Sequence, residues 1–297
     1  MKNLHVDLSL IDSVCDTQKM KREEKLAALD HHIGIEMAYF SELSSTPEAS
    51  RTRTGSEMDH HIQQYSDLQQ HLNPAYLAWR SLASASEHAG FAEHMRYVTT
   101  GGVVMRPQSS LGRVSLLGAA RALFVLRPDD PKERQIRSAR LANQESKDAQ
   151  RMLDTWGTQV DMDPVFLSDL EDQTRKLADA AAELLAEASL RATGSINEVS
   201  MLKKVVEETE GFPIDAEAQA LALWNRLSGV SHARSWIWST PYGTNPRFDF
   251  LGTWTIPTAL MTEAWRLWNL RRGDSTIPHL VPDEWQPNRE RWGKTPV

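Results

Sequence analysis

Cysteine is nearly missing from this sequence of 297 residues, which contains Cys15 alone. A single cysteine cannot form an intrachain disulfide or a cysteine-based metal cluster. Long apolar runs are missing as well, because no uninterrupted stretch reaches the roughly 18 residues of a membrane-spanning helix. The N-terminal stretch carries Asp7 and Asp12 where a secretory signal has an uncharged core. We therefore expect a cytoplasmic protein that does not enter a membrane.

The sequence also lacks the motifs of most familiar enzyme classes. It has no phosphate-binding loop of the type G-x-x-x-x-G-K-[ST] or G-x-G-x-x-G, and no G-x-S-x-G nucleophile elbow. Cys15 has no evident basic partner that would activate it. The formal net charge is −7, so any contact with nucleic acid requires a local basic patch. We expect no cofactor.

Helical periodicity is what the sequence does contain. Apolar residues make up 40% of the chain and charged residues 25%, as in soluble globular proteins. In successive segments the apolar residues recur at steps of three and four, and short polar loops separate the segments. This pattern predicts an all-α protein built as a helical bundle. The expected helices cover 17–44, 57–72, 74–100, 109–127, 130–157, 163–194, 196–209, 215–239 and 256–272, with a loop at 239–254.

Composition suggests three segments. An N-terminal helical segment covers 1–72, a central helical bundle covers 73–240, and an extension rich in tryptophan and proline, with one helix, covers 241–297; together they could form one continuous domain. The aromatic C-terminal region is a candidate surface for a protein partner. Eight of the ten tryptophans lie in the last quarter: Trp224, Trp236, Trp238, Trp254, Trp265, Trp268, Trp285 and Trp292.

Two histidine pairs near the N-terminus resemble metal ligands. His32 and Glu36 are four residues apart, so on a helix they share a face. However, no Glu-x-x-His pair lies on a clearly apolar inward face, as a di-metal helical bundle requires. Solvated helix faces are the better interpretation, and we expect no metal site. The residues concerned are Asp30, His31, His32 and Glu36, and Glu57, Asp59, His60 and His61.

The stretch "WNRLSGVSHARSW", at 224–236, is the strongest candidate site. A histidine can act as general acid or base near neutral pH, and an arginine can hold a phosphate with two hydrogen bonds. Arg226 and His232 point about 120° apart on a helix, so a second helix or a second subunit would have to complete a cleft between them. Ser228 lies one turn before His232 and can orient the imidazole.

The same small residues have a structural interpretation. Ser228, Gly229 and Ser231 remove bulk from the helix surface and let another backbone approach closely. In that case the stretch is a packing seam and His232 is a buried, hydrogen-bonded side chain.

A helix ending in "NRLSGVSH", preceded in the chain by the apolar segment "SSLGRVSLLGAARALFVLRPDDPKERQIRSARL", resembles the HEPN superfamily over roughly 75–240. The resemblance implies a compact α-helical bundle that dimerises through the motif helix, here 215–239. Active members are metal-independent ribonucleases with a composite site at the dimer interface. By this resemblance His232 would be the acid/base and Arg226 would bind the phosphate.

The resemblance also assigns supporting roles. Asn225 or Ser228 would be the supporting polar group, and Arg234 could add a phosphate contact. The sequence departs from active members at Leu227, where a polar residue usually follows the arginine, and at Arg234, where some members carry a tyrosine. Two functions remain open: a metal-independent endoribonuclease with a role in defence or as a toxin, and a non-catalytic dimeric protein that binds RNA or a protein partner.

Overall fold

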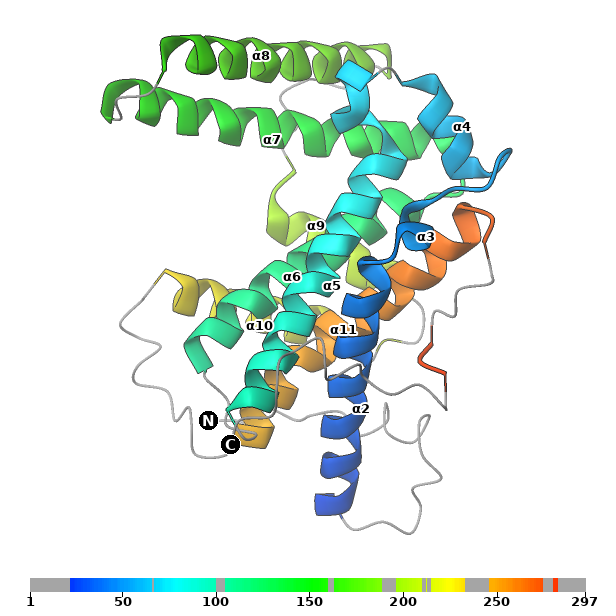
Figure 1. Cartoon of the computed structure of the whole chain (residues 1–297), viewed down its shortest axis with the longest axis vertical. Helices are drawn as coiled ribbons and strands as arrows, with labels where there is room; N and C mark the ends of the chain where they lie inside the picture. Colours follow the sequence, from blue (N-terminus) through cyan, green and yellow to red (C-terminus); the bar gives the residue numbers. More distant parts are fainter. Residues whose placement is uncertain are drawn as a thin grey trace.

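Helices are the only regular elements in the computed structural model, which describes residues 22–65, 67–99, 105–159, 163–188, 196–209, 212, 215–232, 246–274 and 280–282. The all-α prediction is confirmed within these residues (Figure 1). The elements are α2 (Arg22–Ser44), α3 (Pro47–Ser50), α4 (Glu57–Gln64), the 3₁₀ helix η1 (Asp67–Leu72), α5 (Pro74–Val98), α6 (Met105–Leu126), α7 (Pro131–Gln159), α8 (Pro164–Glu187), α9 (Glu198–Glu207), α10 (Ala216–Ser231) and α11 (Pro246–Arg271).

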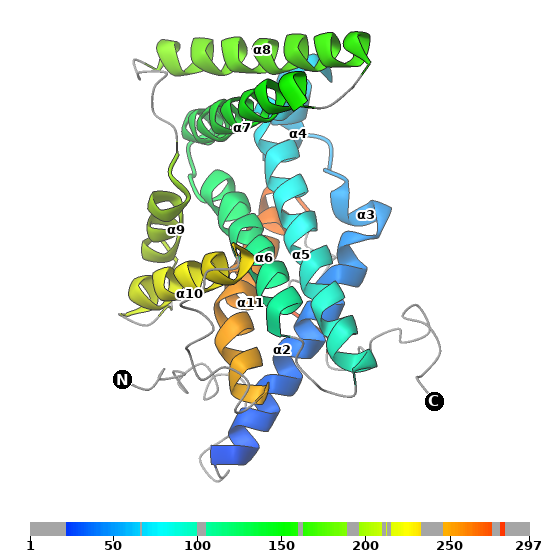
Figure 2. The ribbon, with the colours of Figure 1, turned by 90° about the vertical axis from the view of Figure 1, so that its left-hand side faces the viewer.

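The centre of the molecule is the pair α5 and α6. Helices α2 and α11 pack on this pair, α9 and α10 lie along the other side of α6, and α7 and α8 lie side by side across one end (Figures 1 and 2). Buried side chains of α2, α5, α6, α9, α10 and α11 belong to a single apolar cluster. The N-terminal, central and C-terminal segments therefore contribute to one core.

Several helix boundaries follow from local chemistry. Asn73 caps α5 by accepting the N–H of Ala75 at 2.9 Å, and Pro74 occupies the first turn, where its missing N–H costs nothing. The single helix predicted over 57–72 is instead divided, because Tyr65 adopts an extended conformation between α4 and η1.

The predicted start of the last helix was wrong. The sequence placed it at about 256, with Pro257 in the first turn, and assigned 239–254 to a loop. In the structure α11 begins at Pro246, and Pro257 lies inside the helix. A proline within a helix removes one backbone hydrogen bond but does not always end the helix when the surrounding packing holds it.

Buried arginines close the C-terminal end of α6. The last carbonyl groups of a helix have no partners within the helix, and a guanidinium group offers five N–H donors. Arg134, Arg137 and Arg271 are between 0 and 5% exposed. Arg137 donates to the Phe124 carbonyl at 3.0 Å. Arg271 donates to the Leu126 carbonyl and, at 3.2 Å, to the Arg127 carbonyl. Arg134 donates to the carbonyls of Pro128 (2.7 Å) and Asp129 (2.9 Å) in the loop that follows.

Helix α4 supplies the counter-charge for these arginines. The Glu57 carboxylate lies 2.6 Å from Arg134 and 2.8 Å from Arg271. His61, one turn further along α4, accepts a hydrogen bond from Arg134 through Nε2 at 3.2 Å and is only 2% exposed. The expectation of a solvated face was therefore wrong for His61, although His31 and His60 are exposed.

The burial of His61 predicts a pH dependence of stability. Burial, helped by the charge of Arg134, lowers the pKa of His61 from 6.5 to about 4. Because the folded pKa is lower than the unfolded one, this contribution is fully present above pH 6.5 and is lost as the pH falls toward 4. The wild type should lose about 2 kcal/mol more unfolding free energy than His61→Gln when the pH falls from about 8 to about 5. Urea unfolding at both pH values measures this, with exposed His31→Gln as the matched control; equal losses in wild type and His61→Gln would contradict it.

The described tryptophans of α11 lie in the core. Trp254, Trp265 and Trp268 are at most 1% exposed. Trp265 stacks on Phe40 with ring centroids 5.9 Å apart, and its indole N–H donates to the Ser86 hydroxyl at 3.1 Å. A protein partner at the C-terminal region would therefore have to contact other residues.

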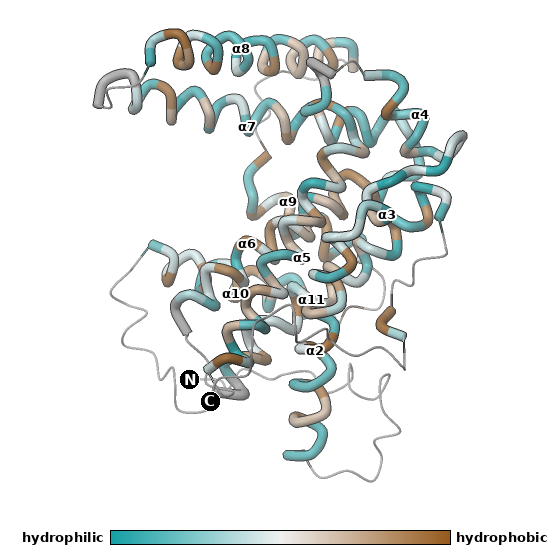
Figure 3. Tube along the Cα trace, viewed as in Figure 1, coloured by the Kyte–Doolittle hydropathy of each residue, from teal (hydrophilic) through white to brown (hydrophobic). Residues whose placement is uncertain are grey.

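One helix in the described part of the chain is long and apolar enough to cross a membrane, namely Pro107–Leu126 within α6. The search for uninterrupted apolar runs missed it because Arg113 and Arg121 divide the stretch. In the fold, 67% of the apolar window is buried among the other helices, and hydrophobic residues gather at this centre (Figure 3). This burial is typical of the core helix of a folded bundle.

Candidate functional site

Arg226 connects α10 to α11. Its guanidinium group donates to the carbonyl of Gly252 at 2.6 Å and to the hydroxyl of Thr253 at 3.0 Å. Pro257 has no N–H to donate to the Thr253 carbonyl, four residues earlier. Arg226 therefore fastens α10 to α11 at the turn that Pro257 weakens.

The other residues of the motif lie in different environments. His232 caps the C-terminal end of α10, where its backbone N–H donates to the Ser228 carbonyl at 3.0 Å, and its side chain is exposed. Asn225 is also exposed. Arg234 lies outside the described residues. The packing-seam interpretation required a buried His232, whereas His232 is exposed in the structure.

The small residues of α10 pack against α6 of the same chain. Leu227 is fully buried, and a Cβ added at Gly112 of α6 would lie 3.8 Å from the Leu227 side chain. The Ser231 hydroxyl lies 3.4 Å from that of Ser110. Part of the small-residue surface of α10 therefore contacts α6 of the same chain. Dimerisation through 215–239 stays a prediction.

Ser228 contacts an arginine that the sequence analysis did not single out. Arg113 of α6 donates to the Ser228 hydroxyl through Nε at 3.1 Å and to the Glu198 carboxylate of α9 at 3.1 Å. Arg113 also lines a cavity of about 390 Å³ between α5 and α6, which we call the arginine groove. Its lining residues are His71, Tyr76, Leu77, Arg80, Ser81, Ser84, Arg113, Val114, Leu117, Gly118, Arg121 and Glu145.

Helical spacing places these side chains in the groove. Tyr76, Arg80 and Ser84 follow one another at four-residue steps on α5, so they share a face. Arg113 and Arg121 are eight residues apart on α6 and also share a face, at a separation of about 12 Å along the helix axis. This spacing along the helix suits separate phosphates of a strand better than one small anion.

The groove carries an excess of positive charge. It contains three arginines and one carboxylate, Glu145, which pairs with Arg121 at 3.3 Å, while Arg113 pairs with Glu198 outside the groove. Arg121 also keeps a buried Nε for which the described residues offer no acceptor. Arg80 is exposed, and its guanidinium carbon lies 5.8 Å from the centre of the Tyr76 ring. Among the described residues no ion pair neutralises Arg80, so its charge faces solvent.

Aromatic rings form one end of the groove. His71 meets Tyr76 edge to face, with ring centroids 5.5 Å apart and an interplanar angle of 79°. Aromatic faces beside arginines are the usual platform on which single-stranded nucleic acids stack their bases. The groove thus combines cationic side chains with aromatic rings.

One histidine of each N-terminal pair, His32 and His61, is used within the fold. His32 and Glu36 share a face as predicted, 3.5 Å apart, and the hydrogen bond to Glu36 raises the pKa of His32. Asp30 pairs with Arg96 at 2.9 Å, and Glu57 is held by buried arginines. Among the residues that the structure describes, no group of three His, Cys, Asp or Glu side chains could hold a metal ion.

The sequence contained a signal for the groove that the motif search missed. Arg113 and Arg121 are the charged residues of the apolar stretch Pro107–Leu126, at a spacing that puts them on one face. Two charged residues on the same face of a largely buried helix indicate that this face borders a polar surface. The pairing with Arg80 is not readable from sequence, because it depends on how α5 packs against α6.

Comparison with known proteins gave no match to a family model, a curated protein or a solved structure.

Proposed function

We propose that this protein binds single-stranded RNA, with the phosphates held by the arginine groove. One observation carries the proposal: Arg80, Arg113 and Arg121, from two helices, line one cavity that contains a single carboxylate and adjoins the rings of Tyr76 and His71. Binding of this kind needs only a local basic surface, so the net charge of −7 does not oppose it. The spacing of Arg113 and Arg121 favours a strand over a single anion.

Charge reversal at Arg80 tests the proposal. We expect Arg80→Glu to weaken the binding of a fluorescent ten-nucleotide RNA by about tenfold or more, because a charge-assisted contact worth about 1.5–3 kcal/mol becomes repulsive. Fluorescence anisotropy measures the affinity. Arg51→Glu is the matched control, since Arg51 is an arginine of similar exposure at the end of α3, outside the groove. Equal affinities for the two variants would refute the role of the groove.

A metal-independent endoribonuclease with Arg226 and His232 in its site is the second candidate. Two observations favour it: α10 adjoins the groove through the contact of Ser228 with Arg113, and His232 is exposed at the end of that helix. The geometry of Arg226 counts against it, because its guanidinium group would have to release Gly252 and Thr253 in order to bind a phosphate. We therefore favour binding without cleavage.

Incubation of labelled RNA with the protein in EDTA separates the two candidates. We expect bound, intact RNA with the wild type and with His232→Ala. We expect Arg226→Ala to lower the free energy of unfolding by about 1–3 kcal/mol, because its two bonds to α11 are lost. Cleavage that leaves 2′,3′-cyclic phosphate ends, and that disappears in a folded His232→Ala variant, would instead establish the ribonuclease.

A further inference from the structure

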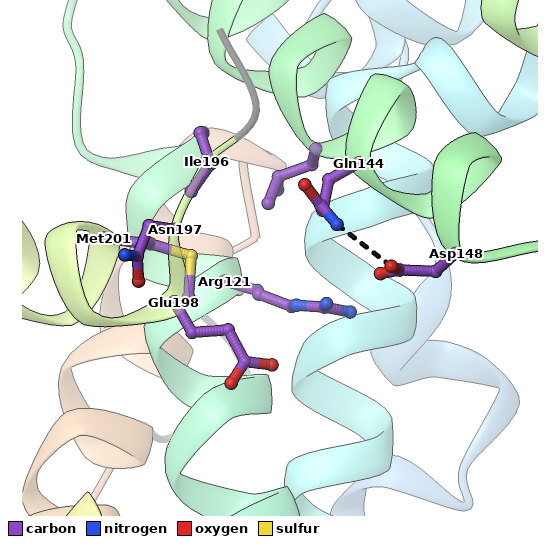
Figure 4. Close-up of a pocket in the computed structure, with 8 residues that line it drawn as sticks. Arg121, Gln144, Asp148, Ile196, Asn197, Glu198 and Met201 are labelled. Atoms are coloured by element: carbon purple, nitrogen blue, oxygen red, sulfur yellow. Dashed lines mark hydrogen bonds between the residues drawn. The ribbon is translucent and has the colours of Figure 1, made fainter. Parts of the chain in front are cut away.

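A second cavity adjoins the arginine groove at Arg121. It has a volume of about 270 Å³ and is lined by Arg121, Leu141, Gln144, Asp148, Ile196, Asn197, Glu198 and Met201. Arg121 lines both cavities. When a strand in the groove binds Arg121 through a phosphate, the base next to that phosphate can enter the second cavity. Figure 4 shows the Arg121 side chain crossing this cavity between Glu198 on one side and the Gln144–Asp148 pair on the other.

The cavity combines an apolar lining with two carboxylates. Leu141, Ile196 and Met201 supply an apolar surface suited to the face of a flat ring. Asp148 and Glu198 are carboxylates, which accept hydrogen bonds and donate none. Both are partly occupied: Oδ1 of Asp148 accepts from Gln144 at 3.0 Å and pairs with Arg151, and Oε2 of Glu198 accepts from Arg113 at 3.1 Å. Each carboxylate has two oxygens with several lone pairs, so acceptor capacity remains.

Donors in the cavity stand beside the carboxylates. Asn197 uses its side-chain oxygen to accept the N–H of Val199 at 2.9 Å, which leaves its amide NH₂ as a donor. The guanidinium group of Arg121 and the amide NH₂ of Gln144 are further donors. A ligand that matches this set presents adjacent N–H groups to a carboxylate and one carbonyl oxygen to an amide or a guanidinium.

We propose that this cavity binds a guanine base of the RNA strand held in the arginine groove. The proposal rests on the proposed function, because the groove holds the phosphate that brings the base here. Guanine presents N1–H and the N2 amino group side by side, which a carboxylate accepts as a pair, and an O6 acceptor next to them. Adenine and cytosine offer an amino group beside an unprotonated ring nitrogen, whose lone pair a carboxylate repels, and uracil offers one N–H between two carbonyls.

Base substitution within one oligonucleotide tests this proposal. The probes are fluorescent decauridylate and the same strand with one central guanosine, with affinities measured by anisotropy. We expect the wild type to bind the guanosine strand about tenfold more tightly, since one well-formed bidentate contact discriminates between bases by that order. We expect Asp148→Asn and Glu198→Gln to reduce this ratio, with the affinity for decauridylate unchanged or slightly raised by the loss of a negative charge.

Helix α7 provides a matched control for Asp148. Asp154 accepts from Gln150 at 2.9 Å, just as Asp148 accepts from Gln144, but it lies outside the cavity. Asp154→Asn removes the same charge from the same helix but outside the cavity, so the guanosine preference should remain at the wild-type value.

The outcomes separate the two proposals. If the wild type binds both strands equally well and Arg80→Glu weakens the binding of decauridylate, the guanine site is overturned but the arginine groove is not. A guanosine preference that persists in both Asp148→Asn and Glu198→Gln also overturns it. Failure of the wild type to bind either strand overturns both proposals.

Discussion

Replacement of Arg271 by alanine is expected to lower the free energy of unfolding by about 3–5 kcal/mol. Arg271 is 4% exposed and donates to the carbonyls of Leu126 and Arg127 and to the carboxylates of Glu57 and Asp129. Its loss leaves the carbonyl groups at the end of α6 without these donors and removes one of the two arginines that hold Glu57. The two carbonyl groups lose buried donors at a cost of about 1–3 kcal/mol each, whereas the carboxylates of Glu57 and Asp129 are exposed and remain hydrated.

Urea unfolding of Arg271→Ala and of Arg266→Ala measures this effect. Arg266 lies five residues earlier on α11, is an arginine in an ion pair with Glu263, and has a side chain that is 43% exposed. An exposed pair of this kind contributes about 0–1 kcal/mol. A loss in Arg271→Ala no larger than the loss in Arg266→Ala would show that the buried arginines do not secure the end of α6.

Gly118 is expected to be a second position of large effect. A Cβ added here would lie 2.7 Å from the Ser81 carbonyl oxygen, 3.0 Å from the Ala85 Cβ and 3.2 Å from the Ala85 nitrogen. Two of these three atoms belong to the backbone of α5, which cannot move aside as a side chain can. We expect Gly118→Ala to lower the free energy of unfolding by about 1–3 kcal/mol through overpacking, although alanine favours a helix over glycine by about 1 kcal/mol.

Gly34→Ala is the matched control for Gly118→Ala. An added Cβ at Gly34, also inside a helix, would meet the flexible ends of Arg96 and Glu93. These ends can shift, so we expect a change within about 1 kcal/mol of zero. Thermal or urea unfolding compares the two variants, and equal stabilities would contradict a close backbone contact between α5 and α6. Because Gly118 also lines the arginine groove, the destabilised variant should bind RNA more weakly as well.

The helical architecture was predictable from the sequence because apolar residues recur at helical steps in most segments and several helices, among them α5, α8 and α9, carry their own N-caps. The start of α5 at residue 74 was predicted correctly, since its cap and its first-turn proline depend on neighbouring residues alone. The start of α11 was predicted wrongly, because its first turns were assigned to the 239–254 loop and the packing that holds the helix there comes from distant residues such as Arg226. His61 was misjudged for the same reason: its polar neighbours in the sequence do not reveal the buried arginines that surround it in space.

The candidate site was less predictable than the fold. The motif search pointed to Arg226 and His232, which are close in sequence, whereas the groove combines Arg80 of α5 with Arg113 and Arg121 of α6. Glycine and alanine in α6 indicate that some helix approaches closely, but they do not identify α5 as that helix. Ser228 connects the predicted motif with the arginine groove, because it belongs to the motif and accepts a hydrogen bond from Arg113.

The salt dependence of RNA affinity tests the central claim most directly. Each phosphate contact with a single strand contributes about 0.7 to the slope of log Kd against log salt concentration, so three arginines predict a slope of about 2 for the wild type. Arg80→Gln should reduce that slope by about 0.7 and Arg51→Gln should leave it unchanged. A wild-type affinity that does not depend on salt, or an equal slope in the two variants, would contradict the binding of phosphates in the arginine groove.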